Sequence, residues 1–130
     1  MPLTNAPFIL SEIAAALDKL VATGERSSIY LSQFPMTEED AGFLKEFLGL
    51  GATFIEIGGL ARTRFRESGY PGVWWGEYYA TPEKVSLRTI EIAEAPELVA
   101  ASKDDIVEGL GRLTAGLPAI GQEAACTKPE

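Results

Sequence analysis

Three arginines at alternating positions, Arg62, Arg64 and Arg66, are the residues of this chain best suited to bind an anion. Because successive side chains of a β-strand point to opposite faces, a strand here would project all three guanidinium groups from one face. Guanidinium groups bind carboxylates and phosphates through paired hydrogen bonds, so the pattern favours recognition of an acidic partner. The alternative is structural, because neighbouring strands could supply acidic residues for cross-strand pairing. The residues available for such pairing are Glu56, Glu77 and Glu91.

Paired carboxylates are the one enzyme chemistry that the residue types of this chain could offer, as in glycoside hydrolysis. Glu77 and Glu91 are the candidates, because each is flanked by apolar residues on an expected strand, where burial would raise the pKa of a carboxyl group. The spacing of these two residues adds no support. Glu38, Glu39 and Asp40 instead suit the first turn of a helix, where the helix dipole favours negative charge. We therefore expect no enzyme, and a small carboxylate-based hydrolase is the alternative.

Histidine is absent from this chain of 130 residues, and the single cysteine is Cys126. Histidine is the commonest general base and metal ligand, so neither a Ser-His-Asp nor a Cys-His site can be built. Zinc sites, iron–sulfur clusters and disulfide frameworks need more thiols or imidazoles than the chain contains. We expect no metal site and no cofactor, and the cysteine usage fits a reducing cytoplasm.

The charge and hydropathy of the chain exclude two classes of partner. A formal net charge of −8 argues against nucleic acid, whose binding needs clustered lysines and arginines. No apolar run approaches the roughly 18 residues of a membrane span. The N-terminus also lacks the basic region and apolar stretch of a signal peptide. These features predict a cytoplasmic protein that binds neither nucleic acid nor membrane.

Both tryptophans and three of the four tyrosines lie in the segment Tyr70–Tyr79. Pro71 fixes its own φ and Gly72 can take the positive φ of a type II turn, so the segment begins with a turn. The residues Val73–Tyr79 favour a pleated strand. This strand carries most of the large, rigid side-chain surface of the protein.

Alternation along the aromatic strand divides its side chains between two faces. Trp74 and Tyr78 face one side, and we expect them in the core. Trp75 and Tyr79 face the other side, and we expect them to contact a partner, since tryptophan and tyrosine dominate the strongest contacts of protein interfaces. The alternative is that both faces are buried in the core.

Hydrophobic periodicity and turn residues predict a two-layer α+β fold, in which about three helices pack on a mainly antiparallel sheet of four to five strands. Thr37 is a good N-cap for the second helix, and Gly116 can end the third. A single domain is expected over residues 1–116 and a disordered tail over 117–130. The expected helices span 7–23, 37–49 and 102–115, and the expected strands span 28–32, 52–57, 60–67, 73–79 and 84–92.

Several segments together resemble the C-terminal conserved region of the HupH-type hydrogenase expression/formation proteins. The most specific are Glu67–Trp74, which contains Tyr-Pro-Gly-Val-Trp, and Thr89–Pro96, which contains Ile-Glu-Ile. The resemblance extends over roughly residues 8–114, through three further segments: Ile13–Gly24, Leu31–Gly49 and Asp105–Leu113. Two departures stand out. Typical members have a further N-terminal region, and they often carry a branched apolar residue at the position of Gly76.

The resemblance implies that this chain is an accessory protein in the maturation of nickel–iron uptake hydrogenases. Proteins of this family are thought to act as chaperones for the iron–sulfur-bearing small subunit before its export by the twin-arginine route. The expected partner is therefore the small subunit precursor, another maturation protein, or both. A homodimer that pairs through an exposed strand edge is a further alternative. The expected partner-binding residues are Trp75, Tyr79, Arg62, Arg64 and Arg66.

Overall fold

The computed structural model describes residues 4–59 and 61–123 of the chain. The chain divides into two compact units, Met1–Val99 and Ala100–Glu130, which are described in turn. The prediction of a single domain over 1–116 stays a prediction. Residues 117–123, expected in a disordered tail, are helical, and Cys126 lies outside the described residues.

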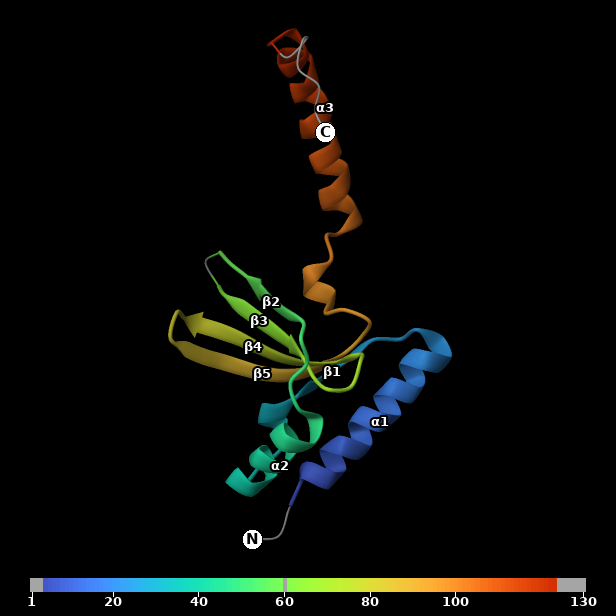
Figure 1. The fold of residues 1–130 in the computed structure, drawn as a ribbon, viewed down its shortest axis with the longest axis vertical. Coiled ribbons are helices and arrows are strands. Elements are labelled where there is room, and N and C mark those ends of the chain that lie inside the picture. The colour runs from blue at the N-terminus through green and yellow to red at the C-terminus, as the bar shows by residue number, and fades with distance from the viewer. Residues whose placement is uncertain (1–3, 60, 124–130) are drawn as a thin grey trace. The chain divides into compact units, whose positions relative to one another are not determined.

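The first unit is built on a five-stranded antiparallel sheet, in the order β1-β5-β4-β3-β2 (Figure 1). The α+β prediction with an antiparallel sheet is therefore confirmed. Each pair of neighbouring strands is antiparallel in register. The strands are β1 (Ser27–Tyr30), β2 (Phe54–Ile57), β3 (Thr63–Glu67), β4 (Val73–Thr81) and β5 (Lys84–Ile92).

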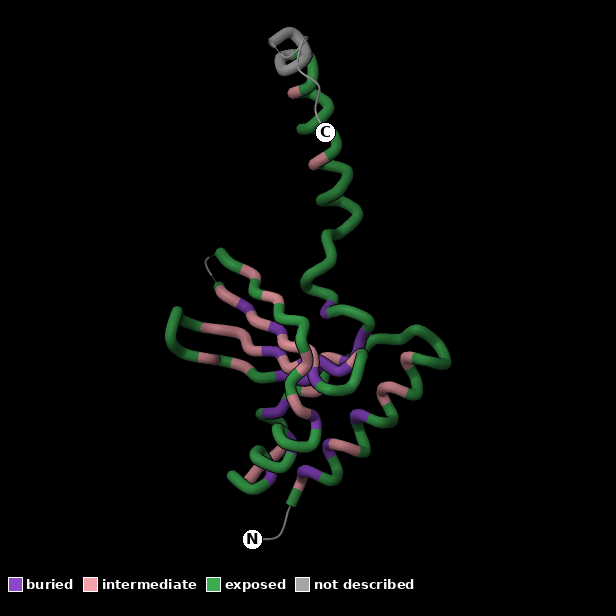
Figure 2. Tube along the Cα trace, viewed as in Figure 1, coloured by how far each residue is buried: buried purple, intermediate pink, exposed green. Residues whose placement is uncertain are grey.

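Two helices, α1 (Ala6–Thr23) and α2 (Glu38–Leu48), pack together with the sheet around one core. Figure 2 shows the buried positions gathered where α1, α2 and the middle of the sheet meet. Short 3-10 turns follow β1 at Leu31–Gln33 and β5 at Glu97–Val99. The core residues are Ala6, Ile9, Ile13, Leu31, Leu44, Leu48, Val73, Ile90 and Ile92.

The aromatic strand β4 enters the sheet from the predicted turn. Gly72 has a φ of 92°, and the amide of Val73 donates to the carbonyl of Tyr70 at 3.1 Å. A positive φ at this position is what a type II turn requires, and glycine adopts it without steric cost. The register between β4 and β5 shifts between Tyr78 and Tyr79 and again between Tyr79 and Thr81.

The helices cover the opposite face of β4 from the one expected. Val73 and Trp75 stand directly beside Ile92 and Ile90, so these side chains share the helix-covered face. Trp74 is buried, with 4% of its surface exposed, but on the other face, where its Nε1 donates to the carbonyl of Ala93. The prediction that Trp74 is buried is confirmed, although the helices cover the other face of β4, which carries Trp75. A period of two shows which residues share a face, but not which face the helices cover.

Asp40 joins the N-termini of both helices. Thr37 and Asp40 form the capping box of α2, which confirms Thr37 as its N-cap. The same carboxylate accepts the amides of Thr4, Asn5 and Ala6, at 2.8, 3.1 and 3.2 Å. Burial raises the pKa of Asp40, but these backbone donors outweigh it and lower the pKa to about 2.

The second unit contains α3 (Lys103–Glu123). The predicted stop at Gly116 is wrong, because the helix continues through Pro118 to Glu123. Its apolar residues recur at helical spacing and form one stripe. The side chains in this stripe are exposed: Ile106, Leu110, Leu113 and Leu117.

Replacement of Asp40 by asparagine should destabilise the fold. Asparagine keeps one neutral carbonyl oxygen and replaces the other oxygen with an NH2 group, so two of the four backbone N–H groups lose their acceptor. Urea unfolding should show a lower midpoint for Asp40→Asn than for Glu39→Gln, which removes an exposed carboxylate from the same helical turn. The acid dependence gives a second readout. Because the folded pKa of about 2 lies below the ordinary 3.8, the stabilisation is complete above about pH 4 and is lost as the pH falls toward 2. The free energy of unfolding of Asp40→Asn should therefore fall less between about pH 4 and pH 2 than that of the unaltered chain.

Replacement of Gly76 by valine should also destabilise the fold. A Cβ at Gly76 would collide with Thr89 Oγ1 and would lie 3.2 Å from the ring of Phe65, so the sheet has no room for a side chain there. Overpacking of this kind costs about 1–3 kcal/mol in the free energy of unfolding. The matched control is Gly42→Ala on α2, where the added methyl meets open space. This control should stabilise the protein by about 0.5–1 kcal/mol in the same urea titration. An unchanged midpoint for Gly76→Val would contradict the close contact.

Candidate partner-binding groove

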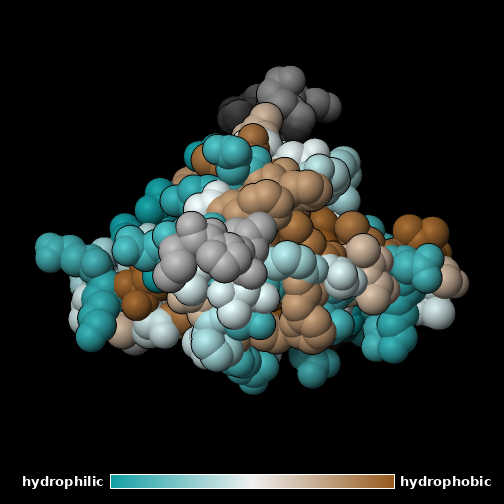
Figure 3. All heavy atoms as spheres, turned by 90° about the horizontal axis from the view of Figure 1, so that it is seen from below, coloured by the Kyte–Doolittle hydropathy of each residue, from teal (hydrophilic) through white to brown (hydrophobic). Residues whose placement is uncertain are grey.

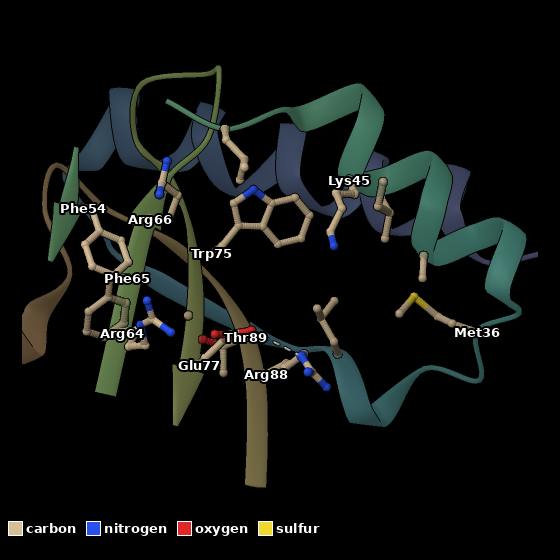
Figure 4. Close-up of a pocket in the computed structure, with 15 residues that line it drawn as sticks. Met36, Lys45, Phe54, Arg64, Phe65, Arg66, Trp75, Glu77, Arg88 and Thr89 are labelled. Atoms are coloured by element: carbon tan, nitrogen blue, oxygen red, sulfur yellow. Dashed lines mark ion pairs between the residues drawn. The ribbon is translucent and has the colours of Figure 1, made fainter. Parts of the chain in front are cut away.

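A groove of about 560 Å³ lies between α2 and the helix-covered face of the sheet (Figure 4). One wall comes from α2 and carries Leu44 and Lys45. The floor and the other wall come from the strands. In Figure 4, Lys45 points from α2 into the groove, across from the side chains of the sheet. The strand residues that line it include Phe54, Arg64, Arg66, Trp75, Glu77 and Arg88.

The register of the sheet places these side chains in two adjacent rows. Trp75 stands beside Arg66 on one side, and Arg66 stands beside Phe54. In the next row Glu77 lies between Arg64 and Arg88. Residues that are direct neighbours across antiparallel strands share a face, so both rows point toward the groove.

Trp75 is a fixed part of this surface. Its Nε1 donates to the carbonyl of Gly49 at 2.9 Å, and its ring packs against the core. One part of the indole is therefore buried and another part lines the groove. A tryptophan held in this way offers a large apolar surface at little cost in conformational entropy.

The arginines of β3 are held by aromatic rings. The guanidinium carbons of Arg64 and Arg66 lie 4.9 and 5.1 Å from the centroid of the Phe54 ring. Arg64 also lies 3.5 Å from Glu56, and its hydrogen bond to the hydroxyl of Tyr79 raises its pKa. The structural alternative is thus realised for Arg64, which pairs with Glu56. Such an exposed ion pair contributes little to stability.

Two of the five predicted residues, Arg62 and Tyr79, line a separate, smaller hollow of about 170 Å³. The guanidinium of Arg62 lies 4.2 Å from the centre of the Tyr79 ring and donates to the carbonyl of Pro82 at 2.8 Å. The hydroxyl of Tyr79 accepts from Arg64 and donates to Glu77, which connects this hollow to the groove. The structure therefore brings together Arg64, Arg66 and Trp75, with Arg62 and Tyr79 beside them.

Sequence reasoning missed Lys45, Phe54 and Arg88 as residues of the site. Lys45 lies four residues after Ala41, which also lines the groove, so helical spacing places both on one face of α2 and was a usable signal. The ring of Phe54 is 42% exposed at the sheet edge and supports both arginines. Nothing in the local sequence marks Phe54 or Arg88, because their role depends on strand pairing.

A second apolar surface lies on α2. The rings of Phe43 and Phe47 are 5.7 Å apart, and Phe47 stacks on Tyr70 at 6.0 Å. All three side chains are exposed. Figure 3, turned to show the helix side, displays brown apolar side chains at the surface among teal hydrophilic ones. Exposed aromatic clusters are typical of surfaces that contact other proteins.

The structure separates the two carboxylates considered for catalysis. Glu77 lines the groove and lies 3.6 Å from Arg88, whereas Glu91 lies on the opposite face beside Trp74. Glu91 accepts the hydroxyls of Ser28, Thr89 and Tyr78. Burial and the nearby charge of Glu91 raise the pKa of Tyr78 to about 12. Two carboxylates on opposite faces of a sheet cannot flank one bond, as glycoside hydrolysis requires.

No cluster of three potential metal ligands occurs among the residues that the structure describes. Within the same residues, no helix is both long enough and apolar enough to cross a lipid bilayer.

Comparison with known proteins identifies the class. The family model described as HupH hydrogenase expression protein, C-terminal conserved region, matches residues 3–120. The hydrogenase expression/formation protein HupH of Rhodobacter capsulatus is 34% identical over 118 residues, which cover 89% of this chain and 42% of the relative. The corresponding protein HoxQ of Cupriavidus necator is 31% identical over 120 residues, which cover 90% and 42%. These relatives are hydrogenase expression/formation proteins.

A solved structure gives the same result for the fold. The hydrogenase expression protein HupH from Thiobacillus denitrificans superposes with a TM-score of 0.83 at 32% identity, covering 91% of this chain and 99% of that chain. The chain belongs to the HupH family of hydrogenase expression proteins and matches its C-terminal conserved region. It spans about two fifths of the length of the curated relatives it matches.

Ionic quenching of tryptophan fluorescence should report the positive charge of the groove. The chain has two tryptophans, so Trp74→Phe leaves Trp75 as the sole emitter. Because cations line the groove, iodide should quench Trp75 more strongly than caesium does, and added salt should reduce the difference. Trp75→Phe is the matched control, and its buried Trp74 should resist both ions. Equal quenching of Trp75 by iodide and caesium would refute a positive groove.

Proposed function

We propose that this chain is a non-catalytic accessory protein in the maturation of nickel–iron uptake hydrogenases, acting in the cytoplasm. In this proposal it binds the precursor of the hydrogenase small subunit or another maturation protein. The observation that carries the proposal is the groove, which gathers Arg64, Arg66 and Trp75 on one surface of a HupH-family fold.

The residue types of the chain support a role in holding a protein. Insertion of nickel, iron or a cluster needs thiol or imidazole ligands, and the chain contains no histidine and one cysteine. The groove instead combines arginines with large aromatic side chains, which are the residues enriched in the strongest contacts of protein interfaces. The exposed aromatic cluster of Phe43, Phe47 and Tyr70 on the helix side adds further surface of the same kind.

Titration of the purified chain with the small subunit precursor tests this function. We expect a complex at micromolar concentration by calorimetry, and Phe54→Ala should weaken it by about tenfold, because Phe54 supports both Arg64 and Arg66. Phe8→Ala is the matched control, since Phe8 is an exposed phenylalanine of α1 outside the groove. The proposal fails if neither the precursor nor the other maturation proteins of the same hydrogenase form a complex at these concentrations.

A further inference from the structure

The groove carries mainly positive charge, although the protein as a whole is negatively charged. The whole chain carries 11 lysines and arginines against 19 aspartates and glutamates. Four of those basic residues line the groove, namely Lys45, Arg64, Arg66 and Arg88, against a single acidic residue, Glu77. A surface enriched in cations is complementary to a negatively charged ligand.

Two of these cations form no ion pair with the side chains that the structure describes. Arg88 pairs with Glu77 and Arg64 with Glu56, at 3.6 and 3.5 Å between side-chain atoms. Among the side chains that the structure describes, Lys45 and Arg66 have no such ion pair. They belong to the two different walls, since Lys45 comes from α2 and Arg66 from β3.

Arg66 is held in position by contacts that supply no negative charge. Its Nη1 donates to the carbonyl of Gly51 at 3.3 Å, and its guanidinium lies over the ring of Phe54. Neither contact supplies a negative charge. A guanidinium oriented in advance, with donors left over, loses less entropy when it binds a carboxylate.

The remainder of the lining is apolar and adaptable. Met36 and the leucines surround the groove together with the aromatic rings, and methionine fits irregular ligand shapes. A free inorganic anion would use none of this surface. A peptide segment with both acidic and large apolar side chains would use all of it, and a volume of about 560 Å³ falls in the range of small-ligand sites. The large apolar lining residues include Leu31, Met36, Leu44, Leu50, Phe54 and Trp75.

We propose that the groove binds an extended acidic segment of a protein partner. Lys45 and Arg66 lie on either side of the Trp75 indole (Figure 4). One carboxylate of the segment therefore pairs with Arg66 and another with Lys45, and a large apolar side chain between them packs against Trp75. This inference rests on the proposed function, because it specifies which part of the client protein the chain recognises. It assigns Lys45 and Arg66 the role of selecting negative charge.

Synthetic peptides of matched length test the chemistry directly. The probe is a capped peptide in which aspartate or glutamate alternates with leucine or phenylalanine at every second position, so that both kinds of side chain lie on the same side of the extended chain. We expect binding by calorimetry, with an affinity that falls as salt rises, and a change in Trp75 fluorescence. Two control peptides separate the contribution of negative charge from that of the apolar side chains. One replaces each acidic residue by its amide, and the other replaces each large apolar residue by alanine. Each should bind at least tenfold more weakly. Equal binding of the amide peptide overturns the inference, as does full displacement of the probe by millimolar inorganic phosphate, which indicates a site for free anions.

Charge variants locate the site. The double variant Lys45→Gln, Arg66→Gln should weaken binding of the acidic peptide by at least tenfold, and Lys45→Arg should retain it. The matched control, Lys84→Gln with Arg112→Gln, makes the same change in net charge at exposed residues outside the groove and should bind as the unaltered chain does. Urea midpoints show that all variants fold. Equal loss in both double variants would mean that net charge alone attracts the peptide, and would overturn the assignment to the groove.

The small subunit precursor separates this inference from the proposed function. A precursor that binds the unaltered chain and the Lys45→Gln, Arg66→Gln variant equally well would refute the groove while leaving the function in place. A chain that binds the acidic peptide through Lys45 and Arg66, but binds neither the precursor nor other maturation proteins, would refute the function while leaving the groove in place.

Discussion

The arrangement of the helices depends on one buried carboxylate. Asp40 completes the capping box of α2 and also accepts three backbone amides at the start of α1. Helix α1 has no acidic residue in its first turn, and its N-cap residue Asn5 makes no side-chain cap. Asp40 therefore supplies from a distant part of the chain the negative charge that a helix N-terminus favours. Because α2 forms one wall of the groove, the position of Lys45, in the next turn or so of the helix, follows from this interaction.

The other end of α2 is fixed by close approach of backbone to backbone. The amide of Gly69 donates to the carbonyl of Leu48 at 2.7 Å, and the amide of Gly51 donates to the carbonyl of Glu67 at 2.6 Å. A Cβ on either glycine would lie within 3 Å of a backbone oxygen, so only glycine permits these contacts. The indole of Trp75 adds a hydrogen bond to Gly49. Helix α2 is thus tied to the start of α1 at its N-terminal end and to the sheet at its C-terminal end, and these hydrogen bonds fix the helical wall of the groove.

Sequence reasoning succeeded where the physics is local and failed where it depends on distant partners. The cap at Thr37 and the turn at Gly72 follow from neighbouring residues, and the structure has both. The shared face of the arginines holds for Arg64 and Arg66, whereas Arg62 precedes β3 and lines a separate hollow. Which face of β4 the helices cover could not be derived, because aromatic residues occupy both faces of that strand. The role of Asp40 in capping α1 was equally inaccessible, since its amide donors lie more than 30 residues away. The groove could not be predicted either, because its walls come from elements that are distant in the sequence.

The aromatic supports of the arginines explain how an acidic protein can keep a positive surface. An ion pair orders a guanidinium but neutralises it, as Glu56 does in part for Arg64. A ring face orders the same group by cation–π attraction, worth about 0.5–1 kcal/mol at an exposed site, and leaves its charge and most of its donors available. Phe54 holds two guanidinium groups in this way, with Arg66 paired to no carboxylate among the described side chains. A site for an acidic ligand needs guanidinium groups that are ordered but keep their charge. This property distinguishes these arginines from arginines that serve only to pair strands.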